Sequence, residues 1–257
     1  MPMRIATWNV NSIRARVDAV VDWLGRVEPD VLCMQETKVV DDDFPTDELQ
    51  RLGYAVAMAG QKTYNGVAIA SRLPFRDVGI GFPGDPPSAD KRLIAATIDG
   101  VRVVSAYVPN GKSVTHADFG KKLAFLARLR EVLAPLVSDG KPVVLCGDFN
   151  VAPDERDVFD VEKMKGQLHF HPDEHRALSE LLSIGLTDAF RLHHAEGGRF
   201  SWWDYRGGGL RKNEGLRIDL VLLSRDLAAR CGRADIDAEE RQRDKPSDHA
   251  PVVVEWG

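Results

Sequence analysis

Short apolar runs separated by turn-forming residues recur along the whole chain, and this pattern constrains the fold more than any other feature of the sequence. Most of the runs are rich in β-branched residues and too short for helices, so they predict β-strands. About ten strands are more than one open sheet of ordinary size holds, which favours two packed sheets. The predicted strands are Met3–Trp8, Val31–Gln35, Tyr54–Met58, Gly66–Ala70, Leu93–Ile98, Val101–Val108, Val143–Cys146, Phe200–Trp203, Ile218–Leu223 and Pro251–Trp256.

Helical periodicity lies between some of the predicted strands. It is clearest over His116–Val137, where apolar residues recur every three to four positions. Weaker patterns predict helices over Arg14–Arg26 and Asp173–Ser183. With helices outside two mixed sheets, the expected architecture is a four-layer α/β sandwich. The repeating positions of the first helix are Phe119, Leu123, Leu126, Leu129 and Leu133.

Two long polar segments, Gly79–Lys91 and Pro153–Phe170, lack periodicity and are expected to be loops. Strand-like runs continue on both sides of each, so neither is expected to join two domains. We therefore predict a single domain over residues 1–257.

The formal net charge of −5 argues against a nucleic-acid partner, because DNA-binding modules are usually basic. A metalloenzyme that cleaves phosphodiesters concentrates carboxylates in its cleft, however, so local charge is more informative than the total. Basic residues do gather near the polar motifs described below, and about half of them are expected to be ordinary surface charge. They are Lys112, Lys121, Lys122, Arg206, Arg211, Lys212 and Arg217.

The cysteines indicate a reducing compartment. Cys33, Cys146 and Cys231 are an odd number, and the first two lie in strand-like runs, which is typical of buried, reduced thiols. The first ten residues contain no apolar signal region, and no stretch approaches the roughly 18 apolar residues that span a bilayer. We expect a cytoplasmic protein that is neither secreted nor inserted into a membrane.

Polar side chains stand at or just after the ends of several predicted strands. Asn9 and Asn11 follow the first strand, and Glu36 follows the second. Strand ends form the rim of the ligand crevice in layered α/β folds, so these residues are expected to converge. Tyr107, Asp148 and Asn150 occupy the same kind of position in later strands.

The types of these residues suit metal-assisted hydrolysis of a phosphodiester. Glu36, Asp148 and Asp248 offer hard oxygen ligands for Mg²⁺. His249 can move a proton near neutral pH, and Asp219, an acidic residue inside an apolar run, can fix its tautomer. Taken singly, most of these residues have a plainer explanation, since Asp148 could shape a turn and Asp248 could cap one. Asp219 is the exception, because a buried carboxylate needs a partner.

A series of motifs in one order resembles exonuclease III and the related abasic-site endonucleases, and the resemblance runs from end to end. The motifs are Trp8-Asn9-Val10-Asn11, Gln35-Glu36-Thr37-Lys38, Tyr107-Val108-Pro109-Asn110-Gly111, Gly147-Asp148-Phe149-Asn150, Phe200-Ser201-Trp202-Trp203-Asp204-Tyr205-Arg206, Leu216-Arg217-Ile218-Asp219 and Ser247-Asp248-His249-Ala250-Pro251. This resemblance implies the two-sheet endonuclease/exonuclease/phosphatase fold and Mg²⁺ as cofactor, with Mn²⁺ able to substitute.

The resemblance also implies a role for each matching position. Glu36 would be the principal metal ligand with Asn9 beside it, and Asp248 would lie near a second or alternative metal position. Asp148 would position or deprotonate the attacking water. The implied catalytic set is Tyr107, Asp148, Asn150, Asp219 and His249, and the implied metal set is Asn9, Glu36, Asp148, Asn150, Asp248 and His249.

The implied partner is double-stranded DNA with abasic sites or damaged 3′ ends, cut by a monomer. An apolar pocket built from Trp202, Leu216 and Ile218 would take an extruded sugar that has lost its base. One of the adjacent Trp202 and Trp203 is expected in the core, and Trp202 is the one assigned to the substrate. Pro153–Phe170 is expected to border the DNA groove. The implied substrate contacts are Asn11, Lys38, Asn110, Trp202, Arg206, Leu216 and Ile218.

Other functions were weighed against this one. A phosphatase of small phosphoesters on the same fold is the main alternative, because the fold alone does not fix the substrate. A zinc protein built on histidines fits no known ligand spacing, and a catalytically inactive DNA-binding scaffold would not need carboxylates facing phosphates. The histidines considered are His169, His171, His175, His193 and His194.

Overall fold

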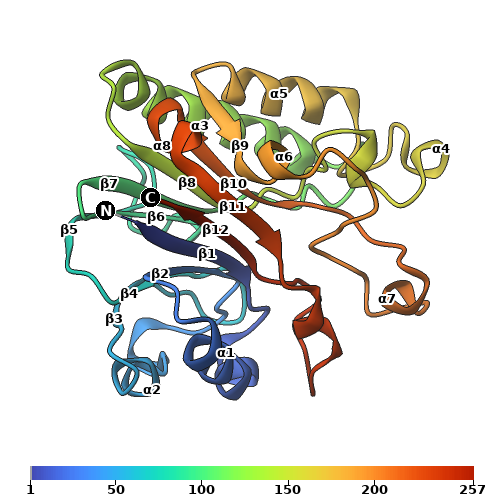
Figure 1. Cartoon of the computed structure of the whole chain (residues 1–257). Helices are drawn as coiled ribbons and strands as arrows, with labels where there is room; N and C mark the ends of the chain where they lie inside the picture. Colours follow the sequence, from blue (N-terminus) through green and yellow to red (C-terminus); the bar gives the residue numbers. More distant parts are fainter. Residues whose placement is uncertain (1) are drawn as a thin grey trace.

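A computed structural model describes residues 2–257. Two six-stranded sheets pack face to face, and helices cover both outer faces (Figure 1). The first sheet has the order β11-β12-β1-β2-β4-β3 and the second the order β5-β6-β7-β8-β10-β9. The strands are β1 (Met3–Asn9), β2 (Val31–Gln35), β3 (Ala55–Ala59), β4 (Val67–Ser71), β5 (Phe75–Ile80), β6 (Leu93–Ile98), β7 (Val101–Tyr107), β8 (Val143–Asp148), β9 (Leu186–Asp188), β10 (Asp219–Ser224), β11 (Cys231–Ile236) and β12 (Val252–Trp256).

Each sheet has one parallel pair at its centre, and the remaining pairs are antiparallel. The parallel pairs are β1 with β2 and β7 with β8, and each needs a crossover connection. Helix α1 makes the first crossover and α3 the second, which places them on opposite outer faces (Figure 1). The helices are α1 (Ile13–Val27), α2 (Thr46–Gln50), α3 (Ala117–Ser138), α4 (Val161–Met164), α5 (Pro172–Leu182), α6 (Ala189–His193), α7 (Gly209–Lys212) and α8 (Arg225–Arg230), with 3₁₀ turns η1 (Asp41–Asp43), η2 (Glu155–Asp157) and η3 (Ala238–Gln242).

Three apolar layers hold the sandwich together. The central layer lies between the two sheets and contains Ile5, Ile69 and Val144. A second layer packs α1 and α2 on the first sheet, and a third packs α3 and α5 on the second. The expected four-layer α/β sandwich is confirmed. None of the helices in residues 2–257 is long and apolar enough to span a bilayer.

Most predicted strands and the three predicted helices are confirmed to within one or two residues, but several strand assignments were wrong. Phe200–Trp203 is not a strand, since Trp202 makes only isolated bridges to Leu216 and His249. Strands β5, β9 and β11 were missed; β9 is very short, and β5 and β11 have exposed residues that break any apolar run. Within Pro153–Phe170 the structure has η2 and α4, and the first residues of Gly79–Lys91 belong to β5.

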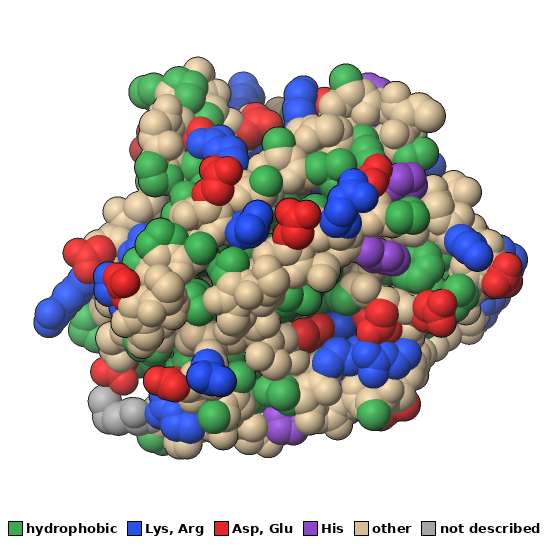
Figure 2. Space-filling view, turned by 90° about the horizontal axis from the view of Figure 1, so that it is seen from above, with side chains coloured by type: hydrophobic (Ala, Val, Ile, Leu, Met, Phe, Trp, Pro, Cys, Tyr) green, Lys and Arg blue, Asp and Glu red, His purple; other side chains and the backbone are tan. Residues whose placement is uncertain are grey.

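All three cysteines are free, as expected from the sequence. The surface over α3 and α5, seen from above in Figure 2, has acidic and basic side chains side by side and is not of one charge. This face therefore offers no patch of a single charge that would indicate a binding surface.

Candidate active site

The polar residues predicted at strand ends lie together at one edge of the sandwich. The parallel strands β1 and β2 both end there, at Asn9 and before Glu36, and β7 and β8 end there at Tyr107 and Asp148. Antiparallel β10 begins at the same edge, because Asp219 pairs with Asp148. Since β1 also packs against β8 across the central core, both sheets contribute to one site.

Asp148, Asp219 and His249 form the buried centre of this site, with 4% or less of each residue exposed. Nδ1 of His249 lies 2.8 Å from Oδ2 of Asp219, and its Nε2 lies 3.8 Å from Oδ2 of Asp148. The hydroxyl of Ser201 donates to Oδ2 of Asp219 at 2.7 Å. Asp219 therefore orients the imidazole with Nε2 toward Asp148, and its predicted role in setting the tautomer stays a prediction.

The pKa values of both Asp148 and His249 are raised in this arrangement, for different reasons. Burial and the nearby charge of Asp219 raise the pKa of Asp148 to about 7, although His249 and hydrogen bonds from Asn9 and Asn150 act in the other direction. Burial alone would lower the pKa of His249, but the charges of Asp219 and Asp148 outweigh it and raise that pKa to about 10. At neutral pH the imidazole is a cation, and Asp148 is poised to gain or lose a proton.

A chain of hydrogen bonds extends from this centre along the edge of the first sheet. Nδ2 of Asn11 donates to Oδ1 of Asp248 at 2.8 Å, and the indole of Trp202 donates to its Oδ2 at 3.1 Å. The ammonium of Lys38 donates to Oδ1 of Asn11 at 2.5 Å and lies 3.2 Å from Glu36. Asp248 is thus held by two neutral donors, and Glu36 by a cation.

Tyr107 and two asparagines complete the site on the side of the second sheet. Burial and the charge of Glu36 raise the pKa of the Tyr107 phenol well above its ordinary value, so the hydroxyl stays protonated. Nδ2 of Asn150 donates to the carbonyl of Val108 at 3.0 Å, and Nδ2 of Asn110 donates to Oδ1 of Asn150 at 3.2 Å. These hydroxyl and amide groups are neutral donors suited to phosphate oxygens.

The donor set fits a hard divalent cation. The carboxylate and imidazole atoms of Asp148, Asp219 and His249 lie within 4.8 Å of one another, and Oδ1 of Asp219 is buried with no hydrogen-bond partner. Glu36 adds a half-buried carboxylate. A cation would offset the negative charge that raises the pKa of Asp148. The sequence did not assign Asp219 to the metal set. The predicted ligand roles all stay predictions, and they are those of Asn9, Glu36, Asp148, Asn150, Asp248 and His249.

The three residues expected to form an apolar pocket do contact one apolar cluster. Leu216 and Ile218 are only 2% exposed and pack with Ala152, whereas Trp202 is half-buried at the edge of the cluster. Trp203 is in the central core, so the prediction that one tryptophan of the pair is a core residue is confirmed. The aliphatic part of the predicted pocket is closed in this structure.

Two of the seven basic residues near the polar motifs are buried, so they do not belong to the expected half that is surface charge. Lys122 is fully buried, and Arg217 is 1% exposed because Asp157 and Asp188 bind its guanidinium. Arg206 is exposed on the loop before α7.

The histidines of the zinc hypothesis do not assemble into a ligand set. His169, His175 and His194 each direct a ring nitrogen to a backbone carbonyl, and His171 caps the start of α5. Within residues 2–257, the one group of three or more suitable metal ligands is the Asp148 cluster.

Sequence reasoning missed three polar contributors to the site. Ser201 lies in one of the motifs but was assigned no role. Its hydroxyl donates to Asp219 and accepts from the backbone N–H of Ile218. Lys122 stands in the apolar stripe of α3, and the ring of His169 lies 6.3 Å from that of Trp202. Only the placement of Lys122 among the apolar positions of a helix was a signal in the sequence.

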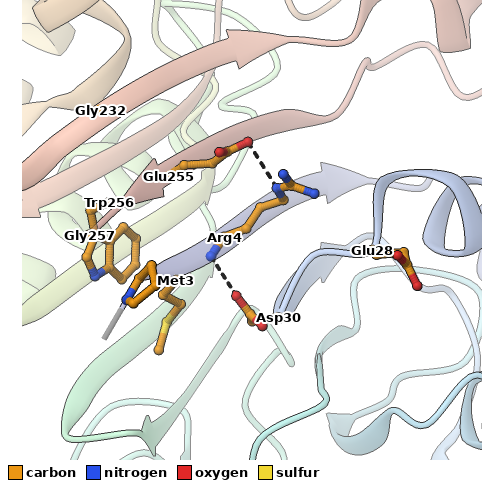
Figure 3. Close-up of a pocket in the computed structure, with 9 residues that line it drawn as sticks. Met3, Arg4, Glu28, Asp30, Gly232, Glu255, Trp256 and Gly257 are labelled. Atoms are coloured by element: carbon orange, nitrogen blue, oxygen red, sulfur yellow. Dashed lines mark hydrogen bonds and ion pairs between the residues drawn. The ribbon is translucent and has the colours of Figure 1, made fainter.

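A second hollow lies at the opposite end of the first sheet, where β1 starts and β12 ends (Figure 3). Its volume is about 470 Å³. Its polar side chains are already paired: the Arg4 guanidinium donates to Glu255 at 3.0 Å, Asp30 accepts from the backbone N–H of Arg4 at 2.7 Å, and Glu28 binds Arg72. The strand-end site is therefore the better candidate for chemistry.

Two packed mixed sheets with buried carboxylates, an oriented imidazole and neutral donors at one edge are suited to the hydrolysis of a phosphoester. The chain belongs to the Endonuclease/Exonuclease/phosphatase family, whose model matches residues 6–249. Within that family it is a nuclease of the exonuclease III type, as the following similarities show.

The chain is 36% identical to exodeoxyribonuclease III of Haemophilus influenzae, over 99% of this chain and all of that protein. Among solved structures it is similar to the 3′ phosphatase NExo from Neisseria bound to a product DNA hairpin, with 41% identity, 99% coverage of both chains and a TM-score of 0.96. It is equally similar in coverage to an AP endonuclease from Archaeoglobus fulgidus, at 40% identity and a TM-score of 0.94. The resemblance inferred from the motifs is confirmed.

Proposed function

We propose that this chain is a Mg²⁺-dependent DNA-repair phosphodiesterase that incises double-stranded DNA 5′ of abasic sites and trims damaged 3′ ends. Mn²⁺ is proposed to substitute for Mg²⁺. The observation that carries the proposal is the buried Asp148–His249–Asp219 cluster beside Glu36, because it joins metal ligands to an oriented proton-transfer group. Exodeoxyribonuclease III and AP endonuclease similarity supports DNA as the substrate.

In this proposal, water attacks phosphorus in line with the departing 3′ oxygen and leaves a 3′ hydroxyl and a 5′ phosphate. Asp148 takes the proton of the water, because a carboxylate with a pKa of about 7 can accept it while the His249 imidazolium cannot. Nε2 of His249 donates to a phosphate oxygen, with Asp219 holding the ring. When bound by Glu36, Asn9 and Asp148, the metal would neutralise negative charge on the phosphate.

The neutral donors around the centre are proposed to hold the phosphate and the sugar. The phenol of Tyr107, protonated because its pKa is raised, and the amides of Asn150 and Asn110 would donate to phosphate oxygens. Lys38 and Asn11 would contact the DNA strand next to the scissile bond. Trp202, Leu216 and Ile218 would line the sugar pocket, and Arg206 would contact the backbone.

A second candidate is that 3′-end processing dominates over incision at abasic sites. It is favoured by the closed pocket, since Leu216 and Ile218 are 2% exposed and the ring of His169 stands beside Trp202. An extruded sugar within a continuous strand needs that pocket open, whereas a terminal 3′ phosphate needs only the catalytic centre.

The deciding experiment compares three duplex oligonucleotides: one with an abasic-site analogue, one with a 3′ phosphate at a nick, and one intact. Each is incubated with Mg²⁺ and with EDTA, using the wild type and Asp148→Asn. Asp99→Asn is the matched control, because Asp99 is an exposed carboxylate in the β6–β7 turn, at the end of β7 away from Tyr107.

Metal-dependent cleavage at the abasic analogue, abolished by Asp148→Asn and kept by Asp99→Asn, is the expected result. Release of phosphate from the nick without cleavage of the abasic duplex would select the second candidate. No action on any of the DNAs would contradict both and favour a phosphatase of small phosphoesters.

We further propose a single domain acting as a monomer in the cytoplasm. Three free cysteines support a reducing compartment. Gel filtration with light scattering tests the monomer, with a dimer mass as the contrary result.

A further inference from the structure

Lys122 is the most deeply buried charge on α3 and stands where an apolar residue is expected. The helix packs on the second sheet through Phe119, Leu126 and Leu129, and Lys122 lies in the same buried stripe with none of its surface exposed. The predicted stripe position Leu123 is only half-buried. Burying an ammonium is unfavourable unless partners satisfy its charge and its donors. The partners of Lys122 therefore indicate its role.

Its three protons have three acceptors. The ammonium donates to the backbone carbonyl of Asn150 at 2.6 Å and to that of Asn110 at 3.2 Å, and it also binds the carboxylate of Glu174. Glu174 is equally buried and accepts from the backbone N–H groups of His169 and His171. The ammonium is therefore fully satisfied.

The two carbonyls belong to the two asparagines whose side chains touch in the active site. Asn110 follows β7 and Asn150 follows β8, so one ammonium ties together the loops after two neighbouring strands. Asn150 has a left-handed backbone, with φ of 52°, a conformation that asparagine adopts more readily than most residues do. Nδ1 of His169 also meets the Asn150 carbonyl, at 2.6 Å.

We propose that Lys122 is a positioning residue, which fixes the Asn110 and Asn150 amides for the scissile phosphate through their backbone carbonyls. A lysine kept for stability alone would need no contact with these loops, and a buried ion pair is often replaceable by uncharged residues without loss of stability. This inference rests on the proposed function, because it assigns the amides to the phosphate.

The test is steady-state kinetics on the DNA that the wild type cleaves in the experiment above. Lys122→Met combined with Glu174→Gln removes both charges, while the glutamine oxygen still accepts from one of the two backbone N–H groups that Glu174 binds. We expect kcat to fall 10- to 100-fold with KM changed less than threefold, since the amides are misplaced but the DNA surface is intact. Leu126→Ala, one turn along α3 and equally buried, is the control for lost stability and should keep kcat well below its melting temperature.

A double-mutant cycle separates positioning from plain stabilisation. In an Asn110→Ala/Asn150→Ala background, the Lys122→Met/Glu174→Gln pair should cause little further loss of kcat, because both amides that Lys122 positions are already removed. An equal fold-loss in both backgrounds, or an unchanged kcat in the otherwise wild-type chain, overturns the inference. Glu174→Gln alone keeps the amine on both carbonyls and should cost much less, so an equal loss would also overturn it.

Where the double variant does not fold, Lys122→Gln replaces it, since an amide keeps one donor group in the same volume. It is expected to lower kcat, and an unchanged kcat contradicts the inference. If the wild type were inactive on all three DNAs, the proposed function would be refuted. Failure of the proposed function can therefore be told apart from failure of the inference about Lys122.

Discussion

At the scale of single residues, ionisation of Asp148 is needed for the proposed activity but lowers the stability of the folded protein. Its pKa in the folded protein is about 7, above the ordinary 3.8, so the folded state binds a proton more tightly than the unfolded chain does. Stability linked to Asp148 is therefore greatest below pH 3.8 and declines as the pH rises through about 7. The carboxylate that would accept the proton of water is the one whose ionisation the fold resists.

Asp148→Asn should remove this decline. As the pH rises from acid to neutral, the free energy of unfolding of the variant minus that of the wild type should increase by about 1–4 kcal/mol, because an amide does not ionise. Urea unfolding in EDTA at several pH values measures the difference, with Asp99→Asn following the wild type. A constant difference across the range would show that Asp148 does not titrate as described.

Metal binding should move the acidic limb of the pH–rate profile. A cation beside Asp148 favours the carboxylate, so metal and proton compete for one group. Single-turnover cleavage measured from about pH 5 to pH 9 should show an apparent pKa near 7 at low Mg²⁺ that falls as Mg²⁺ rises. A limb that stays in place at all metal concentrations would assign the titration to a group away from the metal.

At the scale of elements, the parallel pair β7 and β8 places Tyr107 beside Asp148 and depends on one glycine. Gly147 pairs with Ala106 and has φ of 141°. A Cβ at Gly147 would lie 1.9 Å from the carbonyl oxygen of Ala106, which is backbone and has little room to move. The close approach of these strands therefore requires glycine at this position.

Gly147→Ala should lower the free energy of unfolding by about 3 kcal/mol or more and reduce kcat, since the residue next to Asp148 is displaced. Gly140→Ala is the control: Gly140 also has positive φ, at 72°, but open space around its Cβ, so it should cost about 1 kcal/mol. Thermal unfolding of both variants measures the contrast. Equal costs would mean that the clash with Ala106 is relieved elsewhere.

The sequence predicted central elements well and edges poorly, for a physical reason. Central strands such as β2 and β8 are buried on both faces and appear as continuous apolar runs. Edge strands β5 and β11 expose residues to solvent, so their sequences resemble loops. Phe200–Trp203 has the composition of a strand but is held by single bridges, which no local pattern distinguishes.

The residues of the site also divide into those that the sequence predicted and those that it did not. The residues at strand ends were predicted because chemistry and order along the chain both point to them. Lys122 was not, since a lysine in a helix is ordinarily a surface residue, and its burial depends on Glu174 from a different helix. Ser201 was missed because its acceptor, Asp219, follows it by a separation that sequence periodicity does not relate.

At the scale of the whole molecule, the site exists only when both sheets are packed together. Asn9 and Glu36 come from the first sheet and Asp148 and Asp219 from the second, and the hydrogen bond from Asn9 to Asp148, at 3.0 Å, crosses between them. Cations and anions are interleaved on the outer face over α3 and α5 (Figure 2), and the contact between the sheets is the apolar central core. Folding of either sheet alone would leave the central core exposed.

Unfolding should therefore be a single cooperative transition, as expected for one domain. Trp8 and Trp256 lie in strands of the first sheet and Trp23 lies in α1. Trp202 bridges to His249 at the catalytic edge and Trp203 lies in the central core, so tryptophan fluorescence reports on the first sheet and on its contact with the second, whereas far-UV circular dichroism reports on both sheets. Urea denaturation should give the same midpoint and the same slope by the two methods.

A fluorescence transition that precedes the dichroism change would mean that the first sheet separates while the second persists. In that case Asn9 and Glu36 would leave Asp148 before global unfolding, and nuclease activity would be lost at the first transition. With one transition, activity and secondary structure should disappear at the same urea concentration, because the central core that joins the sheets also assembles the catalytic centre.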